Sequence, residues 1–353
     1  MAAATIEIAG RRVGGGEAPL IVAEAGVNHN GSPDLALQLV DAAAAAGADA
    51  VKFQTFSADA LVGADAPQAG YQRERAPAAS QLAMLRPLEL PSEAWATIRD
   101  RARSRGILFF STPFDLGSVR LLVDLGVPAI KVGSGDLTNL VLLRAAAAHG
   151  VPILLSTGMA TLDEVDAAVR DLHAHGDPPL VLLHCTSAYP ARAEDANLRA
   201  MATLRDRFGV PVGYSDHTLG IATAIAAAGL GAAVIEKHLT LDRSLRGPDH
   251  AASLDPGEFG HLVEAIREVH AALGDGVKAP RPGEEEMRRV ARRSLVVTRS
   301  VDAGEVLRES DLDAMRPADG ISPLRLDEVI GRRAARSLDR GAVLHDEDLE
   351  PTP

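Results

Sequence analysis

Short apolar runs alternate with longer amphipathic stretches over residues 20–275 of the chain. Each run has the length of a strand and ends in polar side chains, as expected for strands buried in a parallel sheet. The runs are residues 20–26, 50–56, 107–113, 129–135, 152–158, 180–186, 210–216 and 233–239. The stretches between them have helical spacing, and most end in glycine. Eight strand and helix units over about 250 residues predict an α/β fold, a closed (β/α)₈ TIM barrel.

Polar side chains stand at the carboxyl end of every predicted strand, from Glu24 on the first to His238 on the eighth. In a closed barrel these ends surround one cavity, and ligands bind there. An open, doubly wound sheet would instead gather its functional residues at one switch point. The distribution over all eight ends therefore favours the barrel and predicts a site at its C-terminal face.

The pattern changes after residue 277. Residues 278–290 are rich in proline, arginine and glutamate, and we expect them to form a linker. Residues 291–353 contain short apolar runs, DAG and DRG turns and little helical period, which indicates a small β-rich module. The sequence thus predicts a barrel domain over 1–277, a linker, and a module close to the lower size limit for independent folding.

Charge and cysteine content exclude several classes of protein. The 353 residues carry a net charge of −12 and only 3% aromatic residues, so nucleic acid would meet neither a broad basic face nor a stacking surface. The single cysteine, Cys185, cannot form an internal disulfide and lies in an apolar run, as a small buried side chain would. No apolar run has the length of a membrane span, and the N-terminus lacks a signal-peptide pattern. We therefore expect a soluble, cytoplasmic protein.

Two histidines follow the last two predicted strands, His217 after the seventh and His238 at the end of the eighth. Neighbouring barrel strands would bring the imidazoles together, and strand alternation would place Glu236 on the same face as His238. Two imidazoles with coordination positions left open suit a catalytic divalent cation. Nitrogen and oxygen donors suit Mn²⁺, Mg²⁺ or Co²⁺ with bound water, and the spacing of the histidines does not choose among these metals.

Lysine is rare in this chain, with only four among the 36 Lys and Arg residues. Positions that keep lysine are therefore candidates for a role that needs a compact ammonium. Lys52 and Lys131 lie on predicted strands two and four, and four hydroxyl residues lie at neighbouring strand ends. These are Thr112, Ser134, Ser156 and Ser215. Together they predict a cradle for a phosphate or carboxylate, although either lysine alone could extend from the core or pair with a carboxylate. Lys237 points outward by alternation, which indicates a structural role.

Further polar residues at the strand ends could orient a polyhydroxylated substrate or move protons. They are Glu24, Gln54, Asp136 and Asp249. The residues by themselves leave other functions open. One is a class I aldolase in which Lys52 or Lys131 forms a Schiff base with pyruvate. Another is a carbohydrate-binding protein that uses the barrel as a platform.

Nine ordered motifs resemble the sialic acid synthase family, which includes N-acetylneuraminate, legionaminate and pseudaminate synthases. They are AEAGVNHNG (23–31), AVKFQTF (50–56), STPFD (111–115), KVGSGDLTN (131–139), LSTGMAT (155–161), HCTSAYP (184–190), GYSDHTLG (213–220), IEKHLTLD (235–242) and GPDHAASL (247–254). The later RPADGISP (316–323) resembles the antifreeze-like (SAF) module at the C-terminus of the family. The resemblance covers nearly the whole chain.

The resemblance implies a role for each matched position. The metal ligands would be His217 and His238. Phosphoenolpyruvate would be bound by Lys52, Thr112, Lys131, Ser134, Ser156, Ser187 and Ser215, and the sugar by Glu24, Gln54, Tyr189, Asp249 and Arg316. Catalysis would involve Glu24, Lys131 and Asp136. Asp136 stands where some members have Glu and would stabilise positive charge at C2, while Ser187 stands where some have Asn.

The implied reaction condenses phosphoenolpyruvate with the aldehyde of an N-acylated mannosamine-type sugar and releases phosphate by C–O cleavage. Its product is a nine-carbon 2-keto acid. The motif spellings favour N-acetylneuraminate or N,N'-diacetyllegionaminate as that product, with pseudaminate as the alternative. In the family the C-terminal module reaches over the barrel of a second subunit, which implies a domain-swapped homodimer.

Overall fold

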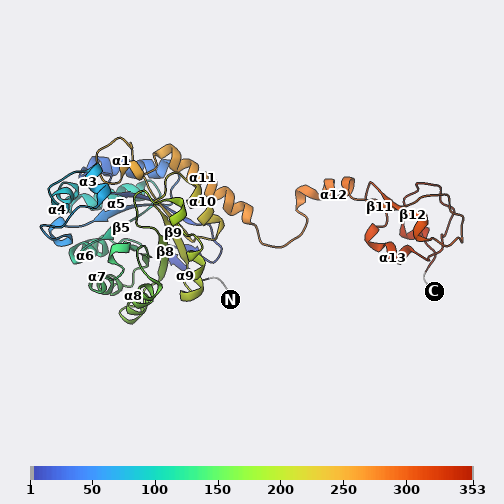
Figure 1. The fold of residues 1–353 in the computed structure, drawn as a ribbon, viewed down its shortest axis with the longest axis horizontal. Coiled ribbons are helices and arrows are strands. Elements are labelled where there is room, and N and C mark those ends of the chain that lie inside the picture. The colour runs from blue at the N-terminus through green and yellow to red at the C-terminus, as the bar shows by residue number, and fades with distance from the viewer. Residues whose placement is uncertain (1–3, 352–353) are drawn as a thin grey trace. The chain divides into compact units, whose positions relative to one another are not determined.

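Eight parallel strands form a closed barrel in the computed structural model, which describes residues 4–351 (Figure 1). Each strand pairs with the next along the chain, and β10 closes the barrel by pairing with β3. The strands are β3 (Leu20–Gly26), β4 (Ala50–Thr55), β5 (Leu108–Pro113), β6 (Ile130–Val132), β7 (Ile153–Ser156), β8 (Leu180–Cys185), β9 (Val212–Asp216) and β10 (Val234–His238). Each begins within two residues of its predicted start, so the prediction of a TIM barrel is confirmed.

Helices surround the barrel and alternate with its strands (Figure 1). The main helices are α1 (Pro33–Ala45), α5 (Ala94–Ser104), α6 (Leu116–Asp124), α7 (Leu140–Ala147), α8 (Leu162–Ala174), α9 (Ala200–Phe208), α10 (Ala222–Gly229) and α11 (Pro256–Leu273). Helix α1 shows why they form: Ser32 caps it by accepting a hydrogen bond from the Leu35 amide, and Pro33 suits its first turn. Its buried residues include Ala36, Leu39 and Val40, on one helical face.

Alternation along each strand divides the hydrophobic core into two layers. Outward side chains such as Ile21 and Phe53 pack beneath the helices, whereas inward ones such as Leu20 and Phe110 fill the barrel. An N-terminal hairpin, β1 (Thr5–Ile8) paired with β2 (Arg11–Gly14), joins this inner layer through buried apolar side chains. The inward face is apolar where the strands begin and polar where they end, so polar side chains collect at the C-terminal face.

The connection between β4 and α5 is longer than the others and carries structure of its own. It contains α2 (Ala58–Leu61), α3 (Gly70–Arg75), α4 (Gln81–Leu85) and the 3₁₀ turn η1 (Arg86–Leu88). Residues 57–90 are called the β4–α5 segment below. The remaining 3₁₀ turns of the first unit are Ser134–Asp136, Ala193–Asp195 and His250–Ala252. Within residues 4–351, no helix combines the length and the apolar character needed to cross a membrane.

The chain divides into two compact units: the first ends at Gly274, and the second begins at Asp275. The second unit contains α12 (Glu285–Ala291), α13 (Leu326–Val329) and an antiparallel pair, β11 (Ser294–Val297) with β12 (Leu312–Met315). Its 3₁₀ turns are Pro282–Glu284, Glu309–Asp311, Pro323–Arg325 and Asp346–Asp348. Leu295, Val297 and Leu344 belong to its separate hydrophobic core. Most of α12 lies within the segment predicted as a linker, 278–290, and the Arg289 carbonyl accepts a hydrogen bond from the Ala318 amide.

Candidate active site

A cavity of about 480 Å³ lies at the carboxyl ends of the strands. Lys52 and Lys131 are both buried, on the inward faces of β4 and β6. The Lys52 ammonium pairs with Glu24 at 2.8 Å and donates a hydrogen bond to Thr112 at 2.9 Å. The Lys131 ammonium donates to Ser156 at 2.7 Å and to the Val132 carbonyl at 3.2 Å. The two lysines and their hydroxyl partners form the floor of the cavity.

Glu236 lies between the two lysines. One of its carboxylate oxygens is 3.8 Å from each ammonium and accepts a hydrogen bond from Ser215 at 3.0 Å. Its other oxygen, Oε2, is buried and has no hydrogen-bond partner within residues 4–351. A buried acceptor of this kind normally binds water or a ligand. Glu236 was expected to face inward with His238 but was not assigned to the site, and its central place depends on the approach of three strands.

The charges of the floor leave it suited to an anion. Burial lowers the pKa of Lys52, but the carboxylates of Glu236 and Glu24 outweigh it and raise that pKa above its ordinary value. Burial lowers the pKa of Lys131, whose nearest carboxylate oxygen, on Glu236, is 3.8 Å away. Burial also raises the pKa of Glu24 to about 7, since Lys52 offsets it only in part. Burial would raise the pKa of Glu236 as well, but Lys131 and Lys52 lower it below the ordinary value. The two lysines are therefore matched by Glu236 and by a Glu24 carboxyl that is only partly ionised near pH 7.

Alternation along β3 places Glu24 in the cavity, and a bulge follows this residue. The register of β3 against β4 shifts between Glu24 and Gly26, and Gly26 has a left-handed φ of 52°. A side chain at position 26 would also approach the Glu24 carboxylate to 3.2 Å, so glycine answers both requirements. Gln54 donates a hydrogen bond to the other oxygen of Glu24 at 3.2 Å. The two residues predicted to contact a sugar therefore lie side by side.

His217 and His238 also line the cavity, with ring centroids 5.5 Å apart. The Nδ1 atom of His217 donates to the Thr186 carbonyl at 2.8 Å, which leaves Nε2 with its lone pair. The Nδ1 atom of His238 is buried without a hydrogen-bond partner in the described chain, and the nearest carboxylate oxygen, on Asp249, is 4.0 Å away. Burial lowers the pKa of both histidines, so both imidazoles are neutral near pH 7.

These two histidines fit a divalent metal ion. Neutral imidazoles are its usual nitrogen ligands, and His238 offers a buried nitrogen that nothing else uses. Residues 4–351 contain no group of three or more His, Cys, Asp or Glu side chains arranged to hold a metal. A cation at this point would thus have two protein nitrogens and keep the other positions for water and substrate, as in catalytic sites.

Aromatic side chains form a continuous contact above the histidines. The Tyr189 ring lies 4.3 Å from that of His217 and 5.9 Å from that of His238, centroid to centroid. Tyr71, on α3 of the β4–α5 segment, lies 5.3 Å from Tyr189. Tyr71 was not predicted for the site, because no motif in that segment indicates which side chains turn toward the barrel.

Most of the other residues predicted in the first unit line the cavity, but two do not, namely Asp136 and Asp249. Ser134, Ser187 and Ser215 line it. Asp136 does not: its carboxylate accepts a hydrogen bond from Asn139 at 3.0 Å, and its neighbours in the 3₁₀ turn form the wall instead. Burial raises the pKa of Asp136, and the Asn139 bond lowers it in part. Arg316 belongs to the second unit. The roles predicted for Asp136 and Arg316 stay predictions.

Cys185 and Lys237 show the two sides of the barrel wall. The Cys185 thiol is buried, as predicted, but its sulfur is 3.0 Å from the Ser134 hydroxyl and borders the cavity. Lys237 is 1% exposed and pairs with Asp216 at 2.7 Å outside the barrel, which confirms its structural role. Lysine thus lines the cavity at positions 52 and 131, whereas at position 237 it forms a buried ion pair outside the barrel.

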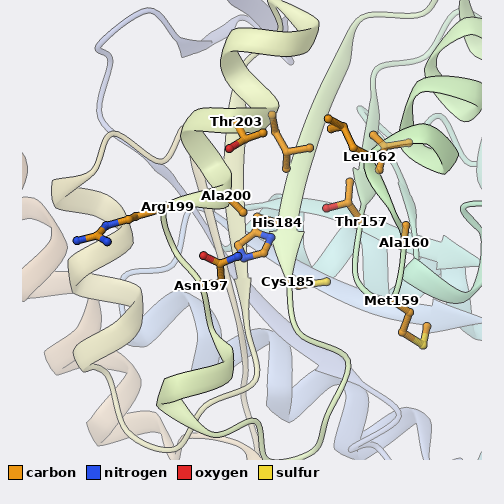
Figure 2. Close-up of a pocket in the computed structure, with 12 residues that line it drawn as sticks. Thr157, Met159, Ala160, Leu162, His184, Cys185, Asn197, Arg199, Ala200 and Thr203 are labelled. Carbon is orange, nitrogen blue, oxygen red and sulfur yellow. The ribbon is translucent and has the colours of Figure 1, made fainter.

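A second cavity, of about 430 Å³, lies between α8 and α9 and shares Met159 and Cys185 with the first (Figure 2). Two of its polar side chains are occupied: His184 Nε2 donates to the Ala196 carbonyl at 2.8 Å, and the Thr157 hydroxyl donates to the Leu183 carbonyl at 3.2 Å. Its one charged side chain is Arg199, and its lining contains no lysine and no carboxylate. The paired lysines, carboxylates and histidines line the first cavity.

Comparison with known proteins gives the family of the chain. The NeuB family description matches residues 39–278, and the SAF domain description matches residues 292–350. The chain belongs to the NeuB family. N,N'-diacetyllegionaminic acid synthases of Legionella pneumophila and Campylobacter jejuni are 47% and 46% identical to it; the alignments cover 94% of this chain and 94% of the first, and 90% of this chain and 96% of the second.

Synthases with other names are also similar to the chain. The crystal structure of an N-acetylneuraminic acid (sialic acid) synthetase from Leptospira borgpetersenii superposes with a TM-score of 0.72 at 36% identity, over 81% of this chain and 95% of that one. Pseudaminic acid synthase of Campylobacter jejuni and mouse N-acetylneuraminate-9-phosphate synthase are each 34% identical to it. The chain is therefore an enzyme, a synthase of the sialic acid type with a TIM barrel and an SAF domain.

Proposed function

We propose that this NeuB-family enzyme condenses phosphoenolpyruvate with an N-acylated mannosamine-type sugar. The observation that carries the proposal is the cavity floor, where one oxygen of Glu236 lies 3.8 Å from the ammonium groups of both Lys52 and Lys131, which are buried. Phosphoenolpyruvate brings a carboxylate and a phosphate to one end of a small molecule. Two ammonium groups and the hydroxyls of Thr112, Ser134, Ser156 and Ser215 provide the donors that such a molecule needs.

The reaction forms one carbon–carbon bond, forms one carbon–oxygen bond from water, and breaks the carbon–oxygen bond to phosphate. C3 of phosphoenolpyruvate attacks the aldehyde carbon of the open-chain sugar, and the aldehyde oxygen takes up a proton. Water then adds at C2; one of its protons replaces the proton taken up by the aldehyde oxygen, and the other goes to phosphate, which leaves with its bridging oxygen to give the 2-keto acid. Glu24 can hold or release a proton near neutral pH, because its pKa is about 7, and it lies next to Gln54 on the sugar side.

His217 and His238 would hold a divalent cation, with Mn²⁺ proposed and Mg²⁺ or Co²⁺ as alternatives. Such a cation supplies Lewis-acid polarisation of a carbonyl and lowers the pKa of bound water. The chain itself prepares for it by keeping both imidazoles neutral and by fixing His217 through Thr186. Tyr189 and Asp249, both close to these histidines, would orient the sugar.

The sugar proposed is the diacetamido-trideoxy-mannose that leads to N,N'-diacetyllegionaminic acid. The support is the 47% identity to a synthase of that name, against 34% for the pseudaminic acid and N-acetylneuraminate-9-phosphate synthases. We further propose a twofold homodimer in which Arg316 completes the sugar site of the other subunit, as the resemblance to the family implies.

One observation favours a second candidate, a class I aldolase that uses Lys131. Burial lowers the pKa of this lysine, which is what Schiff-base formation with pyruvate requires. Lys52 is less suited, since its pKa is raised. A carbohydrate-binding protein without activity would need neither the lowered pKa of Lys131 nor the raised pKa of Lys52.

The test is phosphate release from phosphoenolpyruvate with a panel of sugars. We expect release with the diacetamido-trideoxy-mannose, its loss after treatment with EDTA, and recovery when Mn²⁺ is added back. Borohydride in the presence of pyruvate should leave the protein unlabelled. Covalent, pyruvate-dependent labelling of Lys131 together with EDTA-resistant activity would establish the aldolase instead.

A further inference from the structure

The β4–α5 segment forms one wall of the cavity, and no sequence motif predicts this wall. Four of its residues line the cavity, namely Ala69, Tyr71, Gln72 and Gln81. Tyr71 adjoins Tyr189, which in turn adjoins His217, so this wall lies on the side of the imidazoles. Under the proposed function, that is the side at which the aldehyde end of the sugar would be activated. The wall therefore faces the sugar rather than phosphoenolpyruvate.

The wall is held in shape by hydrogen bonds within the β4–α5 segment. Gln68 is 6% exposed; its amide donates to the Ala76 carbonyl at 2.8 Å and accepts from the Ala78 amide at 3.0 Å. The backbone amide of Gln81 donates to the Ala66 carbonyl at 2.9 Å. A segment fixed in this way presents its side chains without a large ordering cost when a ligand binds.

Two polar groups of the wall are available to a ligand. The Tyr71 hydroxyl receives a hydrogen bond from Gln72 at 3.4 Å, and its own proton has no acceptor within residues 4–351. Burial and the charge of Asp249 raise the pKa of Tyr71 to about 12, so the hydroxyl stays a donor. The side-chain amide of Gln81 makes no hydrogen bond in the described chain, and it can both donate and accept.

The wall carries no positive charge. The basic side chains that line the cavity are Lys52, Lys131, His217 and His238, all from the ends of strands. The arginines of the β4–α5 segment do not line the cavity, and two of them are engaged elsewhere: Arg73 donates to the Gln68 carbonyl and Arg86 pairs with Asp59. A phosphate group on the sugar would find hydroxyl and amide donors here but no cation.

We infer that Tyr71 and Gln81 form a neutral subsite that selects an unphosphorylated sugar bearing a second acylamino group. The inference rests on the proposed function and names its specificity determinants. The hydroxyl and the amide complement the carbonyl and N–H of the second acylamino group, while the Tyr71 ring and Ala69 offer apolar contact to a deoxygenated C6. A sugar with a hydroxyl at C4 would leave the Tyr71 hydroxyl and the Gln81 amide unpaired. A sugar with a phosphate at C6 would place its negative charge against a wall that has no cation.

The experiment compares kcat/KM for three sugars in the intact enzyme, using phosphate release at saturating phosphoenolpyruvate. The sugars are the diacetamido-trideoxy-mannose, N-acetylmannosamine and N-acetylmannosamine 6-phosphate. The variants are Tyr71→Phe, which keeps the ring but removes the hydroxyl, and Gln81→Leu, which removes the amide. Arg75→Ala is the matched control, since Arg75 is an exposed residue on the same helix α3.

We expect each of Tyr71→Phe and Gln81→Leu to lower the preference for the diacetamido sugar over N-acetylmannosamine by about tenfold, the value of one net hydrogen bond. The control Arg75→Ala should leave this sugar preference unchanged, and the affinity for phosphoenolpyruvate should stay the same in all variants. Gln81→Arg should raise activity with the 6-phosphate by at least about tenfold, because it supplies the missing cation.

Two kinds of failure can be told apart. If the wild type releases phosphate with none of the sugars, the proposed function is wrong and the subsite has no substrate to select. If the wild type is active but Tyr71→Phe and Gln81→Leu keep its sugar preference while binding phosphoenolpyruvate normally, the condensation stands and the subsite is refuted. A wild type that prefers the 6-phosphate would refute the subsite as well.

Discussion

The floor of the cavity and the wall from the β4–α5 segment differ in charge, burial and support. The floor consists of ionic side chains at most 4% exposed, on strands fixed by the hydrogen bonds of the closed barrel. The wall consists of neutral side chains on short helices, fixed by a buried glutamine of the same segment. The floor offers donors to charged groups, and the wall offers one hydroxyl and one amide.

This difference indicates a division of labour within one cavity. Removing a charge from a buried ionic group leaves its partners uncompensated, which is costly wherever it happens. Removing a neutral hydrogen-bonding group changes which ligand fits, at a cost close to one hydrogen bond. Substitutions in the floor should therefore abolish the reaction, and substitutions in the wall should change its choice of sugar. The following predictions test that contrast in order of expected effect.

The largest effect is expected for Lys131→Met, which removes the ammonium from the floor. We expect kcat/KM for phosphoenolpyruvate to fall about a thousandfold, because a buried, hydrogen-bonded charge is lost from the ligand's partners. Lys131→Arg should also fail, since the planar guanidinium is larger than the space beside Ser156. Steady-state kinetics with varied phosphoenolpyruvate measure both.

Lys237→Met is the matched control, because Lys237 is equally buried but pairs with Asp216 outside the barrel. It should lower the melting temperature without a selective loss of affinity for phosphoenolpyruvate. If Lys131→Met and Lys237→Met had the same effect on that affinity, Lys131 would have no role in binding beyond that of a structural lysine.

His238→Ala should lower activity more than about a hundredfold while the barrel stays folded. The substitution deletes one of two nitrogens available to a cation, and few other protein donors are present. Bound Mn²⁺, measured after dialysis, should fall together with activity, and the circular dichroism spectrum should not change. Wild-type turnover in a variant that binds no metal would falsify the assignment.

Mixing two inactive variants tests whether the second unit completes the cavity of a partner. Arg316→Ala and His238→Ala chains, each inactive alone, should regain about a quarter of wild-type activity when mixed equally. Random exchange makes half of the dimers heterodimers, and one of the two sites in each combines an intact barrel with an intact Arg316. No recovery after verified subunit exchange would mean that Arg316 acts within its own chain or not at all.

The smallest effect is expected on the outer surface, where Asp41 on α1 pairs with Arg101 and Arg105. Hydrogen bonds from the two arginines lower the pKa of Asp41 to about 2 from its usual 3.8. The stability from these pairs is thus present above about pH 4 and is lost as the pH falls through 2. Asp41→Asn should be less stable than wild type by at most about 1 kcal/mol at pH 7.

Urea denaturation at several pH values measures this difference, which should shrink toward zero as the pH approaches 2. A constant difference between pH 7 and pH 2 would show that charge is not its cause. If the difference does shrink toward zero, the small effect of Asp41→Asn on stability contrasts with the large effect of Lys131→Met on activity, as expected for an ionic group on the surface and one in the cavity.

The strand pattern predicted the floor almost completely. Alternation placed Glu24, Lys52 and Lys131 on the inward faces of β3, β4 and β6, and all three line the cavity. The rule is reliable because a closed parallel barrel allows only two directions for a strand side chain, and the apolar beginnings of the same strands fix which one faces inward.

The turns after the strands were less predictable. Asp136 follows β6 in sequence, but the 3₁₀ turn directs its carboxylate to Asn139 rather than into the cavity. The central position of Glu236 also depends on the distance between strands, which no single strand encodes. Local pattern indicates a face, whereas a turn can rotate the next side chain away from it.

The sequence by itself determined the barrel, its polar face, the paired lysines and the paired histidines, because each follows from a period of two along strands that must bury one side. Only the tertiary structure decided that Tyr71 and Gln81 form a wall of the same cavity, and that Lys52 lies 2.8 Å from a carboxylate oxygen while Lys131 lies 3.8 Å from one. These facts depend on side chains far apart in the chain, and on a segment whose shape comes from its own buried hydrogen bonds rather than from a hydrophobic period.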